Sequence, residues 1–183
     1  MAWRNVALND TITKPSSKKI LLMQTVISNS TPIIHLAKIR KLDLLQRFFG
    51  TITVPQMVWK ECTSPGVKRP EIESIIAVDW IKVVKFNDRI VTLLRHELDH
   101  GEAEAIALAL ERKASLLLLD DSDAREKARL YRLPITGTIG LLLRAYREGM
   151  LISFGETLDE LESSGFRLHK NLKEKLLQET GEK

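Results

Sequence analysis

Residues 98–110 read LDHGEAEAIALAL, and residues 115–121 read SLLLLDD. The first run predicts a helix, because it is rich in strong helix formers whose apolar members fall on one stripe. Asp99 and Glu102 have the spacing of a capping box at its start. The second run predicts a strand buried on both faces of a parallel sheet, since its leucines are uninterrupted until they meet two aspartates. Sites in open α/β sheets form where such strands end, so we expect Asp120 at a site, with Glu102 in the first turn of the preceding helix.

Length and composition indicate one domain with a sizeable core. We expect this domain at residues 20–183, behind a loosely attached, flexible extension at 1–19 that lacks periodicity; Met23 is an alternative start. No apolar run is long enough to span a bilayer, and the first residues do not resemble a secretion signal. The single cysteine, Cys62, fits a reducing cytoplasm, and the net charge of +4 permits an anionic partner.

Strand and helix patterns alternate along the rest of the chain. Strands are predicted at 20–28, 51–54, 80–86, 115–119 and 133–136. Helices are predicted at 32–42, 42–49, 56–62, 70–77, 87–94, 98–110, 123–131, 138–147, 156–163 and 171–178. This order predicts an α/β sandwich with a mainly parallel central sheet.

Four polar residues stand at ends of predicted strands or helices: Asn29, Glu61, Glu102 and Asp120. Two carboxylates about 4 Å apart repel by roughly 4 kcal/mol at an effective dielectric near 20, so a converging group requires a counter-ion. A hard cation such as Mg²⁺ or Mn²⁺ takes oxygen ligands of this kind and promotes phosphodiester cleavage. Taken singly, each carboxylate has a simpler explanation as a helix cap or a surface residue. Their occurrence together favours a metal site.

Five motifs, in this order, resemble those of the PIN-domain family. They are VISNSTPII (26–34), VPQMVWKE (54–61), GEAEA (101–105), LDDSDAR (119–125) and TGTIG (136–140). The likeness covers residues 24–177 and is nearest to a poorly characterised prokaryotic subfamily of toxin-like ribonucleases.

The resemblance implies a three-layer α/β/α sandwich and a metal-dependent endoribonuclease that acts on RNA with Mg²⁺ or Mn²⁺. It also implies a possible toxin role with an antitoxin partner, and a homodimer. By position, the catalytic and metal-binding residues are Asn29, Glu61, Glu102 and Asp120, with Asp121 as a further metal ligand. Candidate contacts with nucleic acid are Ser30, Thr31, Arg125, Arg129, Thr136 and Thr138.

Asn29 departs from the family pattern, which has an aspartate at this position. An amide still binds a cation or orients water, but it carries no charge. The sequence therefore leaves two functions open: an active nuclease, or a catalytically weakened module that binds RNA or protein.

Three other patterns in the sequence bear on these functions. His96 and His100 match the zinc-protease pattern H-E-x-x-H, but the capping Asp99 predicts a new helix between or just after them, which separates the two side chains. A receiver-type signalling domain would need an acidic pair after the first strand and a lysine after the last, and neither is present. Arg125 and Arg129 fit either a phosphate-binding stripe or an exposed helix face.

Overall fold

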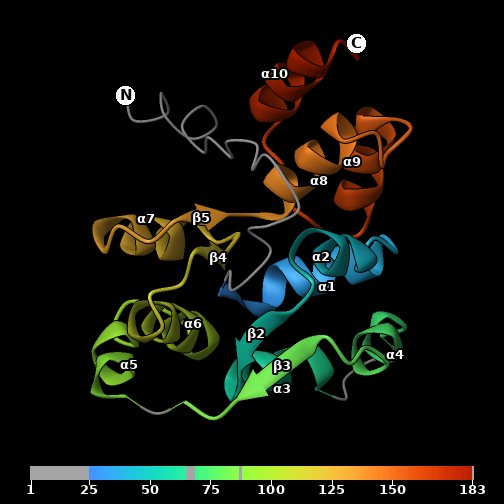
Figure 1. The fold of residues 1–183 in the computed structure, drawn as a ribbon. Helices are drawn as coiled ribbons and strands as arrows, with labels where there is room; N and C mark the ends of the chain where they lie inside the picture. Colours follow the sequence, from blue (N-terminus) through green and yellow to red (C-terminus); the bar gives the residue numbers. More distant parts are fainter. Residues whose placement is uncertain (1–24, 65–68, 87, 183) are drawn as a thin grey trace, which may run out of the picture.

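The described part of the chain contains five strands: β1 (Val26–Ser28), β2 (Ile52–Pro55), β3 (Ile81–Val84), β4 (Leu116–Leu118) and β5 (Ile135–Thr136). They form one sheet in the order β3-β2-β1-β4-β5, and every neighbouring pair is parallel (Figure 1). The computed structural model describes residues 25–64, 69–86 and 88–182. The extension predicted at 1–19 and the first part of the strand predicted at 20–28 lie outside these ranges.

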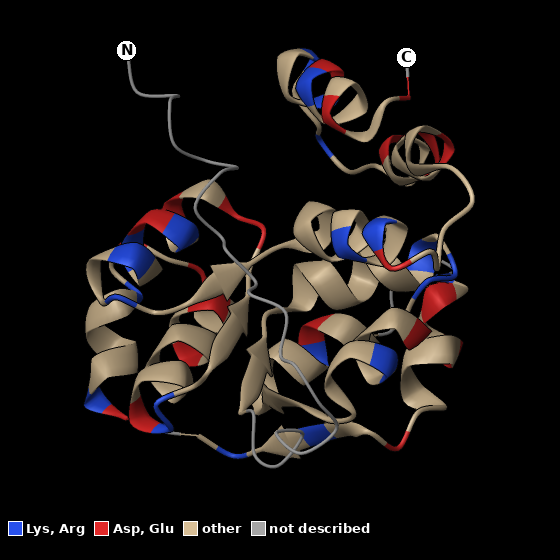
Figure 2. Ribbon diagram, turned by 45° about the horizontal axis from the view of Figure 1, so that its top comes forward, with Lys and Arg blue, Asp and Glu red and all other residues tan. Residues whose placement is uncertain are grey.

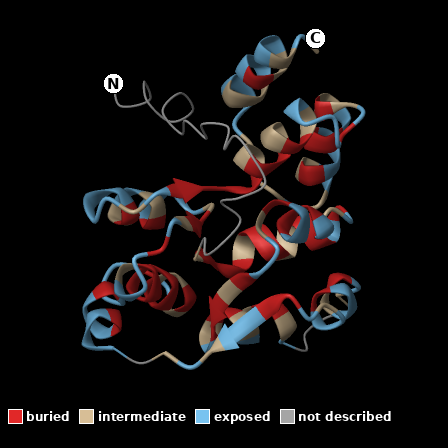
Figure 3. Cartoon of the chain, viewed as in Figure 1, coloured by how far each residue is buried: buried red, intermediate tan, exposed pale blue. Residues whose placement is uncertain are grey.

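The central strands β1 and β4 form the core of the sheet. Ile27 pairs with Leu117, and Ser28 with Leu118, and all four side chains are fully buried. Figure 3 shows buried residues along the strands and on the helix faces that cover them. Uninterrupted apolar strands need cover on both faces, which the helices provide. The predicted parallel α/β sandwich is therefore confirmed.

Helices flank the sheet on both sides (Figure 1). They are α1 (Ser30–Lys38), α2 (Asp43–Phe49), α3 (Gln56–Thr63), α4 (Glu71–Ile76), α5 (Arg89–Leu94), α6 (His100–Glu111), α7 (Ser122–Leu130), α8 (Thr138–Arg147), α9 (Phe154–Ser163) and α10 (Lys170–Thr180). None of the described helices is both long and apolar enough to cross a membrane.

Helix α6 begins where its sequence predicts. Asp99 is its N-cap and forms a capping box with Glu102. The helix packs across β1, β2 and β4 through small and aliphatic side chains, and residues from Ala103 to Ala109 are all buried. Alanine allows a close approach to the sheet at little entropic cost. The first turn of α6 is thereby fixed near the carboxyl ends of the central strands.

Several predicted elements are shorter in the structure, and two of them differ most clearly at one end or both. The helix predicted to run to residue 42 ends at Lys38, because Arg40 adopts a left-handed conformation with φ of 56° and turns the chain. The strand predicted at 80–86 is limited to Ile81–Val84, at the edge of the sheet, where a single neighbour, β2, holds it. Neither change moves a candidate site residue.

Glu182 ties the end of the described chain to the start of α9. Its carboxylate accepts hydrogen bonds from the backbone N–H groups of Gly155 and Phe154, at 2.7 and 3.0 Å, and from the Ser153 hydroxyl at 2.9 Å. The bonds from Gly155 and Phe154 lower the pKa of Glu182 to about 2. An anion at a helix N-terminus is favourable, so this contact stabilises the packing of the C-terminal helices.

We expect Glu182→Gln to lower the melting temperature at neutral pH by about 2–4 °C, as the loss of a helix cap does. The pKa of Glu182 is lower in the folded protein than in the unfolded chain. Its stabilisation is therefore present above about pH 4.5 and is lost as the pH falls towards 2. Melting curves of both proteins should converge over that range. Glu179→Gln, which removes an exposed ion pair with Arg147, is the control with little effect. A difference that persists undiminished at low pH would contradict this role.

Candidate functional site

The candidate site lies where the strand order of the sheet reverses. β2 and β3 lie on one side of β1, whereas β4 and β5 lie on the other. Ligands of open α/β sheets bind at such switch points, beyond the carboxyl ends of the strands. Asn29 directly follows β1, and Asp120 stands two residues after β4. The backbone N–H of Asn29 donates to the carbonyl of Leu118 at 2.9 Å, which fixes the two strand ends side by side.

Ser30 connects Asn29 with Glu61. Asn29 is the N-cap of α1, Ser30 is its first residue, and Glu61 belongs to α3. The Ser30 hydroxyl donates to Oε2 of Glu61 at 2.6 Å and lies 3.5 Å from Oδ1 of Asn29. Asn29 is 2% exposed and Ser30 is 7% exposed, so these contacts are largely shielded from water. One hydroxyl group thus lies between an amide and a carboxylate.

Glu102 brings a second carboxylate from the first turn of α6. Its Oε2 accepts a hydrogen bond from the backbone N–H of Asp99 at 3.2 Å. Partial burial, followed by the negative charge of Asp121, raises the pKa of Glu102 to about 7; the Asp99 hydrogen bond opposes the rise, and the charges of Asp99 and Glu61 add to it. A carboxyl group that keeps its proton near neutral pH indicates a site with no cation to balance its negative charges.

A polar cavity of about 280 Å³ opens between these side chains. The residues that line it come from the start of α1, from α3 and from the start of α6: Asn29, Ser30, Thr31, Glu61, Asp99, His100 and Glu102. Three of the four residues predicted to converge, Asn29, Glu61 and Glu102, therefore face one cavity. They come from distant parts of the sequence, and only the fold brings them together.

The fourth residue, Asp120, is not part of the cavity lining. Its Oδ1 accepts from the backbone N–H of Thr138 at 2.7 Å, and its Oδ2 accepts from the Thr138 hydroxyl at 2.5 Å. Burial raises the pKa of Asp120, while the two bonds from Thr138 and the positive charge of Arg125 lower it. The carboxylate is thus held in one orientation at the N-terminus of α8.

The remaining predicted residues have structural contacts of their own. Asp121 is exposed and caps α7 by accepting from the backbone N–H groups of Asp123 and Ala124, both at 2.9 Å. Arg125 donates to the backbone carbonyl of Leu119 at 2.9 Å, and Arg129 is exposed on the same helix. Figure 2 shows basic and acidic residues spread over the helices.

Two of the three threonines proposed for nucleic-acid contact are buried. Thr136 is 3% exposed and ends β5, and Thr138 is 0% exposed and begins α8. The hydroxyl of Thr138 is engaged with Asp120. Thr31, by contrast, lies in the cavity lining. Of the three, only Thr31 is open to a ligand in this conformation.

His100 lines the cavity, although its sequence pattern did not predict it as a residue of this site. It is the first residue of α6, whereas His96 lies in the turn after α5, so the H-E-x-x-H pattern is split between two elements. Nε2 of His100 lies 3.3 Å from Oε1 of Glu104. His100 directly follows the capping Asp99 and stands two residues before Glu102. This position in the sequence could have indicated that His100 lies at the site.

Glu104 has a structural role. It is 8% exposed, and its Oε2 accepts from the backbone N–H of Met57 at 3.1 Å. Met57 lies in the first turn of α3, where backbone N–H groups have no partner within the helix. Glu104 therefore fastens α6 to α3, the helix that carries Glu61.

The oxygen atoms of the cavity suit a hard divalent cation. Glu61 and Glu102 offer carboxylates, and Asn29 offers an amide oxygen. Within residues 25–64, 69–86 and 88–182, no three His, Cys, Asp or Glu side chains are close enough to hold a metal ion. Mg²⁺ is usually bound through one or two carboxylates and keeps several waters. These residues therefore fit an ion that is only partly enclosed by protein.

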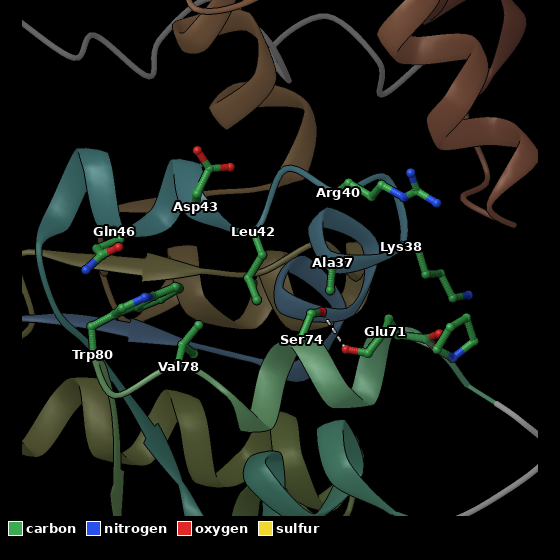
Figure 4. Close-up of a pocket in the computed structure, with 11 residues that line it drawn as sticks. Ala37, Lys38, Arg40, Leu42, Asp43, Gln46, Glu71, Ser74, Val78 and Trp80 are labelled. Atoms are coloured by element: carbon green, nitrogen blue, oxygen red, sulfur yellow. Dashed lines mark hydrogen bonds between the residues drawn. The ribbon is translucent and has the colours of Figure 1, made fainter.

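A larger cavity, of about 610 Å³, lies elsewhere in the molecule (Figure 4). It shares no residue with the site described above. Its two carboxylates already have partners, since Asp43 pairs with Arg47 at 3.0 Å and Glu71 pairs with Arg69 at 2.9 Å. We therefore place the chemistry at the smaller cavity.

Comparison with known proteins gives two findings. A search among curated proteins finds no match to the chain. The model of a family described as PIN domain matches residues 25–182, which span the whole described structure. PIN domains are generally nucleases, and they generally use divalent metal ions. The chain belongs to the PIN-domain family.

Proposed function

We propose that this protein is a metal-dependent endoribonuclease that cleaves phosphodiester bonds of RNA. The observation that carries the proposal is the cavity at the switch point of the sheet, where Glu61 and Glu102 face Asn29. The raised pKa of Glu102 supports it, because a partly buried carboxylate that has acidic neighbours and no counter-ion is unfavourable.

Glu61, Glu102 and Asn29 would hold Mg²⁺ or Mn²⁺, which supplies an activated water and stabilises the charge that develops on the phosphate. Ser30 fixes the Glu61 carboxylate through its 2.6 Å hydrogen bond. Thr138 fixes Asp120, which would act beside the cavity. These residues set the orientation of the oxygen donors before any ligand binds.

RNA would approach along the start of α1 and along α7. Thr31 faces the cavity, and Arg129 is exposed on α7, where it is free to follow a phosphate backbone. A toxin role with an antitoxin partner, a homodimer and a cytoplasmic location are further proposals that rest on the family resemblance of the motifs.

A second candidate is a module that binds RNA or protein with little cleavage. The amide of Asn29 favours it, because one negative charge is missing from the cavity.

An assay with labelled single-stranded RNA separates the two candidates. We expect cleavage with Mn²⁺ or Mg²⁺ and none with a chelator. Glu61→Gln should reduce cleavage by more than roughly 100-fold. Replacing a residue that only hydrogen-bonds to a metal ligand already lowers activity about 10–100-fold, and Glu61 is proposed as a ligand itself. Glu73→Gln, on the exposed face of α4, is the matched control. Cleavage that survives the chelator would refute the metal-dependent mechanism, and RNA binding without cleavage would support the second candidate.

A further inference from the structure

Gly101, the second residue of α6, lies directly against the carboxylate of Glu61. A Cβ atom built on Gly101 would lie 2.6 Å from Oε2 and 2.8 Å from Cδ of Glu61, and still closer to Oε1. The carboxylate therefore occupies the space of a side chain at position 101. Gly101 has no positive φ, and glycine is a poor helix former, so backbone conformation does not explain it.

Gly137, the N-cap of α8, has the same relation to Asp120. A Cβ built on Gly137 would lie 2.5 Å from Oδ1 of Asp120 and 3.1 Å from both the Arg125 guanidinium and the Leu119 carbonyl. Its backbone, with φ of −129°, is extended and suits any residue. Here too the space taken by a carboxylate accounts for the glycine.

Most other described glycines serve a different purpose. Four of them have positive φ and open space around the Cβ position: Gly50, Gly149, Gly165 and Gly181. Gly155 is the second residue of α9, as Gly101 is of α6, and its Cβ would lie 3.1 Å from Glu182, a tight contact without severe overlap. Gly155 is therefore a matched control for Gly101, remote from the candidate site.

We propose that Gly101 and Gly137 are positioning residues, which place the Glu61 and Asp120 carboxylates by leaving the side-chain space beside each helix start empty. The relevance of this placement to metal binding rests on the proposed function. A methyl group at position 101 would push the Glu61 carboxylate away from α6 and strain its bond with Ser30. Because that carboxylate ends a flexible side chain, the fold should survive while the site is disturbed.

A double-mutant cycle in metal-free buffer tests the contact itself. In a Glu61→Ala background, Gly101→Ala should raise the melting temperature by about 1–4 °C, as expected when alanine replaces glycine in a helix. In the natural background the same change should give a smaller rise or a fall, because the carboxylate must move. In the same way, Gly137→Ala should raise the melting temperature more in an Asp120→Ala background than in the natural background. Equal shifts in both backgrounds would overturn the proposal for that glycine.

Thermal melting with and without Mn²⁺ tests whether the placement of the Glu61 carboxylate affects metal binding, and it needs no activity assay. Gly101→Ala should reduce the Mn²⁺-induced rise in melting temperature, whereas Gly155→Ala should keep the full rise. A full rise in Gly101→Ala would overturn its positioning role. If the natural protein shows no rise at all, the metal-dependent function fails, and the double-mutant cycle alone decides whether the glycines place the carboxylates.

Discussion

Replacing Glu102 with glutamine is expected to stabilise the metal-free protein at about pH 8 and to remove its response to divalent ions. The pKa of Glu102 is about 7 in the folded protein, against 4.5 for an ordinary glutamate. Ionised Glu102 therefore destabilises the folded protein. The free energy of unfolding falls as the pH rises from about 4.5 to 7, and the loss is complete above about pH 7. Glutamine cannot ionise, yet it still accepts the hydrogen bond from Asp99 in the capping box.

The two effects have opposite signs, which separates a site residue from a helix cap. Because Glu102 is partly exposed, screening reduces the stability gain to about 1 kcal/mol, or 2–4 °C in melting temperature. The Mn²⁺-induced rise should disappear, and RNA cleavage should fall by more than roughly 100-fold. Thermal melting at about pH 5 and 8, with and without Mn²⁺, measures both.

Glu111→Gln is the control for Glu102→Gln, since Glu111 is exposed at the far end of the same helix. It should change neither the pH dependence nor the Mn²⁺ response. An unaltered Mn²⁺ response in Glu102→Gln would show that capping is the whole role of this carboxylate.

The sheet and the helix that covers it could be predicted because their signals are local. The leucine run before Asp120 indicates a fully buried strand, and the Asp99–Glu102 spacing fixes the start of α6. Where a local signal was overridden, the prediction was wrong. Apolar periodicity continued to residue 42, but the left-handed turn at Arg40 ends α1 earlier.

The contacts within the site could not be predicted, because they join segments far apart in the sequence. Nothing near Glu61 indicates that Ser30 donates to it or that Gly101 makes room for it. The hydrogen bond that Thr138 donates to Asp120 likewise forms only because β4 and β5 are neighbours in the sheet. The sequence motifs indicate candidate residues, whereas the fold decides which oxygen atoms face one another.

Asn29 is the position at which one added charge should have a large effect. Asn29 Oδ1 and Glu61 Oε2 both lie near the Ser30 hydroxyl, so they are at most about 6 Å apart. Aspartate has nearly the same shape as asparagine but would place a carboxylate there, in a nearly buried position. Two charges about 6 Å apart repel by roughly 3 kcal/mol at an effective dielectric near 20.

We therefore expect Asn29→Asp to lower the melting temperature of the metal-free protein by up to about 10 °C near neutral pH. Mn²⁺ should restore the loss by mass action, and it should bind more tightly, because hard cations gain affinity with each added carboxylate. The metal-induced rise in melting temperature should thus exceed that of the natural protein. Asn171→Asp, at an exposed position of α10, should show the same Mn²⁺-induced rise in melting temperature as the natural protein. Raised RNA cleavage in Asn29→Asp would identify the natural protein as a weakened nuclease, whereas equal metal-induced shifts would show that residue 29 does not face the ion.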